Sequence, residues 1–334
     1  MSDAIAAVPL WIIVLIKSAI LLLIVVTTFA YSMLAERKVM AWMQLRPGPN
    51  RVGPWGMMQP AADALKMMFK EDLTPNTADP LIYRLAPFIS LITAMGAYAI
   101  IPFTGDSGGV YSVGDVNAGI LFIFALTSIG VYGISLAGWA SGSKFPLLGS
   151  VRSTAQMISY ELSMSLSVIG VLLLAGSTSL ATIVTSQARE WFIIPQIVGF
   201  TVYLITAVAE TNRAPFDLVE AETELVGGFH TEYSGLRFGL FFIAEYLNMI
   251  TVSCLATLLF LGGWNPLFGP SGNAWLGLVW FLLKAGMFLF FYIWLRSTLP
   301  RLRYDRLMNF GWKVLLPVAT LNLVVTAVIV AVWG

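Results

Sequence analysis

Seven carboxylates lie between positions 210 and 245, and long apolar segments flank this stretch on both sides. They are Glu210, Asp217, Glu220, Glu222, Glu224, Glu232 and Glu245. An acidic side chain in or beside hydrocarbon costs on the order of a few kcal/mol, and such residues usually move protons, bind cations or pair with a specific charge. The chemistry indicated for this stretch is therefore proton or cation handling at a membrane.

The middle of this stretch has helical spacing. Pro215 suits the first position of a short helix, which Gly227 and Gly228 would end. Carboxylates at i, i+3 and i+7 would then share one face, with Glu222 pointing away: Asp217, Glu220 and Glu224. Like charges on one face raise each other's proton affinity and titrate as a coupled set. The alternative is a solvated acidic loop held by Arg213, but acids in the neighbouring spans favour the reactive interpretation.

The segment 152–176 is polar on two faces. One stripe follows steps of three and four, through Arg152, Gln156, Ser159, Ser163 and Ser167. Roughly opposite lie Thr154, Glu161 and Ser165. Because neither face suits lipid, we expect this segment to be buried between other helices. Glu161 lies about two and a half turns inside, too deep for snorkelling, which favours a proton-path role over a static buried ion pair.

Composition fixes the class of protein. The chain is 58% hydrophobic and 11% charged, with a mean hydropathy of +0.81, which is typical of a bilayer protein. Cys254 is the only cysteine, so disulfides within the chain and cysteine-ligated zinc or iron–sulfur clusters are excluded, and the single His230 cannot form a metal site alone. With 19 basic and 18 acidic residues, no charge excess suggests nucleic acid as a partner.

Eight apolar stretches are long enough to approach the roughly 20 residues that a membrane helix needs. We predict spans at 9–33, 81–102, 119–139, 153–176, 191–209, 238–262, 275–295 and 314–333, the first of them retained rather than cleaved. All Lys and Arg residues except Lys17, Arg189 and Lys284 lie in or beside four alternate connections, at 34–80, 140–152, 210–237 and 296–313. The positive-inside rule places these connections in the cytoplasm and both termini outside it.

The sequence thus predicts a single polytopic, all-α membrane domain over residues 1–334, without internal repeats. Within its spans, Lys17 should snorkel, and Lys284 should snorkel or pair with a buried acid.

The first cytoplasmic connection is the longest. It begins with Glu36-Arg37-Lys38, which either anchor the first helix at the interface or take part in function. Prolines and glycines at 46–54 predict an irregular turn. Residues 60–70 have helical spacing with an apolar arc opposite Asp63 and Lys66, so we expect an amphipathic helix along the membrane surface. Such a helix would either cover an opening toward the lipid or only anchor the chain at the membrane surface.

These residues resemble a known family, the H subunit of bacterial NADH:quinone oxidoreductase (respiratory complex I). Three blocks carry the resemblance, at 36–71, 143–161 and 209–246, with a weaker echo at 300–308. Their most specific parts are Glu36-Arg37-Lys38, Gly48-Pro49-Asn50, Ser159-Tyr160-Glu161, Glu232-Tyr233-Ser234, and Ala209-Glu210-Thr211-Asn212-Arg213-Ala214-Pro215-Phe216-Asp217-Leu218. The blocks occur in order over most of the predicted cytoplasmic face, and the family's eight spans match the predicted number.

The resemblance implies a protein of the bacterial inner membrane that docks the hydrophilic arm, forms much of the quinone chamber and starts a proton path toward neighbouring membrane-arm subunits. Quinone, ubiquinone or menaquinone, would be its substrate, while NADH, flavin and iron–sulfur clusters belong to other subunits. The quinone-binding residues would be Glu36, Arg37, Asp63, Lys66, Arg213, Ala214 and Phe216. The proton path would use Asp217, Glu220, Glu222, Glu224, Glu232, Glu210, Glu161 and Glu245.

One departure from the resemblance is His230, where the family more often has a polar amide. An imidazole there adds a group that titrates near neutral pH, and we expect it at the surface.

Three other functions fit the same acidic core. One is the membrane subunit of an energy-converting hydrogenase or formate hydrogenlyase, which needs no quinone tunnel; the long block from Gln44 to Glu71 argues against it. A second is a quinone reductase fed by F420H2 or ferredoxin. A stand-alone proton or sodium transporter would require no hydrophilic partner.

Overall fold

The computed structural model describes residues 10–104, 116–217, 226–266, 269 and 273–333, and within these ranges the chain is helical with no β-strand. In chain order the α-helices are α2 (Leu10–Met43), α3 (Gln59–Phe69), α4 (Pro80–Ala97), α5 (Gly119–Ala140), α6 (Lys144–Ala175), α7 (Leu180–Ser186), α8 (Ile197–Glu210), α10 (Gly235–Phe260), α11 (Ala274–Thr298), α12 (Tyr304–Phe310) and α13 (Leu316–Trp333). Short turns join some of them: η1 (Pro54–Gly56), η2 (Gly228–His230) and the π-helical η3 (Gly311–Leu315). The predicted all-α class is confirmed.

Seven described helices are long and apolar enough to cross a membrane, one fewer than predicted. The stretch expected at 191–209 contains only the 14-residue helix α8, which rises about 21 Å against a hydrocarbon core of about 30 Å. The residues before it form turns: Gln187 Oε1 accepts the Phe192 N–H at 3.3 Å, and the Ile193 N–H donates to Phe260 O at 3.0 Å. Buried protein groups thus satisfy this non-helical backbone.

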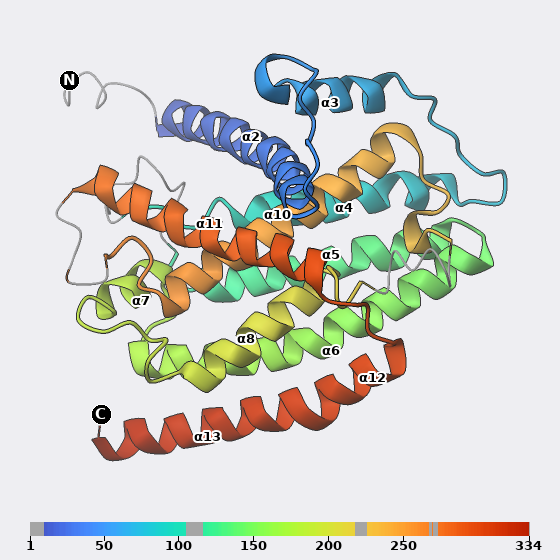
Figure 1. Ribbon diagram of the computed structural model, residues 1–334. Coiled ribbons are helices and arrows are strands. Elements are labelled where there is room, and N and C mark those ends of the chain that lie inside the picture. The colour runs from blue at the N-terminus through green and yellow to red at the C-terminus, as the bar shows by residue number, and fades with distance from the viewer. Residues whose placement is uncertain (1–9, 105–115, 218–225, 267–268, 270–272, 334) are drawn as a thin grey trace.

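The long helices run side by side in one bundle (Figure 1). The central helix α10 contacts α2, α4, α8 and α11, and nearly all of its second half is buried. The first helix α2 lies at one edge against α10, α11 and α3, whereas α13 packs on α6 and α8. The beginning of α2 and the end of α13 lie at the left end of the bundle in Figure 1, and α3 and α12 lie toward the other end.

The burial predicted for segment 152–176 is confirmed for one of its polar stripes, while Thr154, Glu161 and Ser165 of the other stripe are half-buried. In α6 the side chains of Gln156, Ser163 and Ser167 are buried, and this helix contacts α5, α8 and α13. Helix α3 also confirms the helix expected at 60–70, and none of its residues is buried within this chain.

One expectation about a helix end is wrong, and one of the two alternatives for Lys284 is excluded. Helix α2 continues to Met43, so Glu36 lies within a helix and not at the start of a loop. Lys284 pairs with no acid among the described residues: its ammonium donates to the carbonyl oxygens of Leu261 at 2.5 Å, Gly263 at 3.0 Å and Asn265 at 2.6 Å. The carbonyls beyond the end of α10 therefore take the place of a carboxylate, because a helix C-terminus attracts cations. The short helix expected after Pro215 falls mostly outside the described residues.

Candidate functional site

Four charged side chains from three helices and one loop meet inside the bundle. The buried carboxylate of Glu36 on α2 accepts from Arg213 Nη1 at 3.1 Å and also from Arg296 on α11. Arg213 Nε pairs with Glu245 Oε1 of α10 at 2.7 Å. We call Glu36, Arg213, Glu245 and Arg296 the charge cluster. Its two positive and two negative charges balance, as buried charges must.

Arg213 follows directly after α8, and its position is fixed from several sides. Gln156 Nε2 on α6 donates to the carbonyls of Ala209 at 2.8 Å and Phe216 at 2.9 Å, which lie on either side of Arg213. The guanidinium lies 4.3 Å from the ring centroid of Tyr246. Burial opposes the charge of Arg213, but the facing carboxylates of Glu245 and Glu36 outweigh burial and hold the pKa of Arg213 above its ordinary value. The guanidinium is thus a permanent positive centre.

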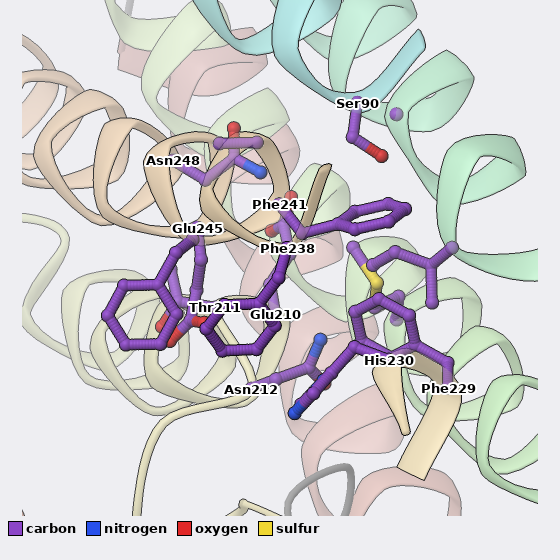
Figure 2. Close-up of a pocket in the computed structure, with 15 residues that line it drawn as sticks. Ser90, Glu210, Thr211, Asn212, Phe229, His230, Phe238, Phe241, Glu245 and Asn248 are labelled. Carbon is purple, nitrogen blue, oxygen red and sulfur yellow. The ribbon is translucent and has the colours of Figure 1, made fainter. Parts of the chain in front are cut away.

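Beside this cluster lies a small cavity that we call the carboxylate cavity (Figure 2). Residues of α4, α5, α6, α8, η2, α10 and the loop after α8 line it, among them Ser90, Glu210, Asn212, His230, Phe238, Glu245 and Asn248. Its free volume is about 50 Å³, which is space for a few waters, since one water needs roughly 10–15 Å³ measured this way. Glu245 therefore belongs to both the charge cluster and the cavity.

Unpaired polar atoms indicate that the carboxylate cavity is hydrated. Ser90 Oγ, Glu210 Oε2 and Asn212 Oδ1 are buried and make no hydrogen bond within the described chain, and all three residues line the cavity. A buried polar atom without a partner costs about 1–3 kcal/mol, so water in the cavity is the simplest way to satisfy them. Water would also join Glu210 to Glu245.

The other predicted proton-path residues that the structure describes do not line this cavity. Glu161 on α6 accepts a hydrogen bond from Ser128 Oγ of α5 and interacts electrostatically with Glu210. Asp217 pairs with Arg301 at 3.2 Å. Glu232 lies apart, where its backbone carbonyl accepts from the Tyr83 hydroxyl at 2.7 Å. Three predicted members lie outside the described residues: Glu220, Glu222 and Glu224.

The residues predicted to bind quinone fall into two groups. Arg37 pairs with Asp63 at 2.6 Å and so joins α2 to α3, where Lys66 is exposed. Ala214 lines a very small hollow of about 10 Å³ beside the charge cluster. Phe216, in contrast, is buried in the core, 6.1 Å from the ring of Tyr160. The structure therefore brings Glu36, Arg213 and Ala214 together and places Arg37, Asp63 and Lys66 in a separate group at α3.

His230 is half-buried, so the expected surface position is only partly correct. Its ring makes edge contacts with Phe229 at 5.1 Å and Phe238 at 5.2 Å, and it lines the carboxylate cavity. Burial lowers the pKa of His230 to about 4, although Asp217 opposes this shift. The imidazole is therefore mostly neutral at pH 7.

Sequence reasoning missed two residues of this site. Arg296 was counted only as part of a basic connection, since a basic residue at a helix end is typical of the positive-inside pattern. Asn248 follows Glu245 by three positions and shares its helix face; that spacing was a usable signal. In the part of the chain that the structure describes, no three His, Cys, Asp or Glu residues lie where they could hold a metal ion.

Comparison with known proteins gives a consistent result. A family described as NADH dehydrogenase matches residues 16–327. The chain is 51% identical over 322 residues to the H 1 subunit of the NADH-quinone oxidoreductase of Symbiobacterium thermophilum, covering 96% of this chain and 98% of that protein. It is 51% identical over 345 residues to the corresponding H subunit of Deinococcus deserti, covering 98% and 87%, and 52% identical over 316 residues to the H 2 subunit of Geobacter sulfurreducens, covering 93% and 94%.

Proposed function

Because this chain belongs to the family of H subunits of NADH-quinone oxidoreductases, we propose that it forms part of the quinone chamber of that enzyme and carries the first steps of its proton path. The observation that supports this most is the position of Glu245. It is ion-paired to Arg213 on one side and lines the carboxylate cavity with Glu210 on the other. A charge change at the cluster therefore acts directly on a group inside the cavity.

The quinone side of this proposal uses Glu36, Arg37, Asp63, Lys66, Arg213, Ala214 and Phe216. Among the described residues, the hollow beside the charge cluster is only about 10 Å³, whereas pockets for small molecules are usually about 300–1,000 Å³. The chamber therefore needs a second wall, which a protein of the hydrophilic arm would supply. Phe216 would support the chamber from the core, and the α2–α3 link between Arg37 and Asp63 would frame an entrance from the lipid.

The proton side connects the cavity to the membrane arm. Reduction of a quinone to a quinol takes up two electrons and two protons, and the loss of those protons makes the chamber more negative. The charge on Glu245, then on Glu210 and Glu161, would respond because charges in a low-dielectric interior are weakly screened. Asp217, Glu220, Glu222, Glu224 and Glu232 would supply protons from the cytoplasmic side.

The rest of the proposal concerns topology and partners. The chain would be one domain of the bacterial inner membrane with both termini outside the cytoplasm, in keeping with the common end at which α2 begins and α13 ends (Figure 1). Hydrophilic-arm subunits would contact the cytoplasmic connections, and other membrane-arm subunits would be its neighbours in the membrane. No observation favours a hydrogenase or stand-alone transporter over the family to which the chain belongs.

The proposal is tested by replacing Glu210 and Glu161 separately with glutamine in the whole enzyme. Each change removes a titratable group at nearly constant volume, so we expect an assembled complex whose NADH-driven quinone reduction falls about tenfold or more, as for the loss of a positioned proton-transfer group. The measurements are quinone reduction and proton uptake per quinol in membrane vesicles. Glu190→Gln, an exposed acid between α7 and α8, is the matched control. Normal rate and normal proton stoichiometry in both variants would refute the proton path.

A further inference from the structure

A second hollow lies next to the carboxylate cavity. It is an open groove of about 340 Å³ at the surface of the chain, and we call it the surface groove. Its lining includes the end of α3 and the beginning of α10, with Met67, Lys70, Thr231 and Ser234 among the residues. Of the residues that the structure describes, two line both the surface groove and the carboxylate cavity: His230 and Phe238.

These two rings form the wall between the hollows. They lie 5.2 Å apart with an interplanar angle of 60°, and Figure 2 shows both beside Glu210 and Asn212. Phe238 carries no group that exchanges protons. His230 carries two ring nitrogens, one of which accepts a proton while the other donates one. Of the two rings in this wall, the histidine is therefore the one that can exchange protons.

We propose that His230 transfers protons from the surface groove into the carboxylate cavity. In each transfer a proton from bulk solvent, relayed by a groove water, adds to one ring nitrogen, and the other ring nitrogen gives its proton through a cavity water to a carboxylate of the cavity, Glu210 or Glu245. A ring flip then restores the starting tautomer, so one proton enters, one leaves and no charge stays on the ring. This inference rests on the proposed function, because it supplies the glutamates of the same path, but it adds an entrance that bypasses the quinone chamber.

The charges around the ring suit transfer in this direction. Lys70 lies on the groove side, while Glu210 and Glu245 lie on the cavity side, and Asp217 acts on the ring electrostatically. Burial lowers the pKa of His230 to about 4, so the ring is mostly neutral at pH 7, with one nitrogen that accepts a proton and one that donates. A proton arriving from the groove is therefore passed on toward the carboxylates instead of being trapped.

Hydration on the cavity side is independently indicated by the unpaired atoms of Ser90, Glu210 and Asn212. The groove side is open in the described chain. Water can therefore reach both faces of the wall, and the ring closes the gap between them.

The first test replaces His230 with phenylalanine in the whole enzyme. This ring preserves the edge contacts with Phe229 and Phe238 but has no nitrogen, so the complex should assemble normally. We expect NADH-driven quinone reduction in coupled vesicles to fall about tenfold or more. If His230→Phe turns over and pumps like the parent enzyme, the proposal is overturned, and a packing role is the correct one.

The second test is chemical rescue of His230→Ala. Added imidazole should enter from the groove and restore turnover in a saturable way, with the rescue following the concentration of neutral imidazole. 1-Methylimidazole, which cannot donate from its methylated nitrogen, should rescue much less. Equal rescue by both compounds, or by neither, would contradict transfer through two nitrogens.

Glu210→Gln, measured beside these variants, separates the two proposals. A slow Glu210→Gln enzyme with a normal His230→Phe enzyme would leave the glutamate path in place and remove only the entrance. Normal turnover in both would remove the path and the entrance together.

Discussion

Replacing Arg213 with methionine is expected to be among the most damaging single changes in this protein. Methionine preserves most of the volume but leaves Glu245 without its 2.7 Å ion pair and weakens the neutralisation of Glu36. Removing one partner of a buried ion pair costs about 3–5 kcal/mol, which is about 150- to 4,000-fold in an equilibrium. We therefore expect little correctly assembled enzyme, measured by native electrophoresis of membranes, and at least about a hundredfold loss of quinone reduction.

The structure also names the change that should repair this variant. Arg296 still neutralises Glu36 when Arg213 is gone, so Glu245 is the carboxylate that loses its ion pair with Arg213. Adding Glu245→Gln to Arg213→Met removes that charge, and the double variant should assemble better than Arg213→Met alone while remaining inactive. Adding Asp217→Asn instead is the control, since Asp217 pairs with Arg301. Equal recovery with both second changes would show that the Arg213–Glu245 pair is not what holds the cluster together.

A lysine at position 213 gives a finer comparison. It keeps the charge, but an ammonium on a flexible stem cannot copy a guanidinium that contacts Glu36 and Glu245 through different nitrogens and stacks on Tyr246. Assembly of Arg213→Lys should therefore exceed that of Arg213→Met, with quinone reduction still below that of the parent enzyme.

The sequence predicted the parts of this site that follow from periodicity and solvation. The two polar stripes of segment 152–176 predicted burial, because such a helix has no face for lipid, and Gln156 is fully buried in α6. Glu161, Glu210 and Glu245 are predicted to be functional because placing an acidic side chain in hydrocarbon is unfavourable in free energy, and such residues usually have a functional role. Glu210 and Glu245 do share one cavity.

What the sequence could not supply was the identity of partners distant in the chain. Glu36 and Arg296 form an ion pair although they lie 260 positions apart in the sequence. No local sequence pattern links two positions so far apart. Three backbone carbonyls, and no acid among the described residues, accept hydrogen bonds from Lys284. Every residue has a backbone carbonyl, so the amino-acid sequence does not show which of them will bind a lysine. The short α8 also escaped prediction, because an apolar run does not show where buried side chains will replace helical hydrogen bonds.

A very close contact between α5 and α6 leads to the second prediction with a large expected effect on assembly. Gly138 on α5 faces α6, and a Cβ added there would lie 2.2 Å from Ser150 Oγ and 2.5 Å from Pro146 O. Helices in membranes approach this closely only through small residues, and the backbone at Pro146 cannot move aside without shifting α6. Gly138→Val should therefore displace the helix that carries Gln156 and Glu161, and abolish assembly into the complex, as native electrophoresis of membranes would show.

A control substitution at another glycine and a second substitution in α6 test this prediction further. Gly286 on α11 has open space where a Cβ would lie, so Gly286→Ala should assemble like the parent enzyme. The milder Gly138→Ala should lower the thermal stability of the complex. Adding Ser150→Gly should recover only part of that loss, since Pro146 O still lies too close. Full recovery by Ser150→Gly would mean that the α6 backbone can move more easily than close-packed helices allow. Normal assembly of Gly138→Val would show that α5 and α6 do not need this contact to position the glutamates.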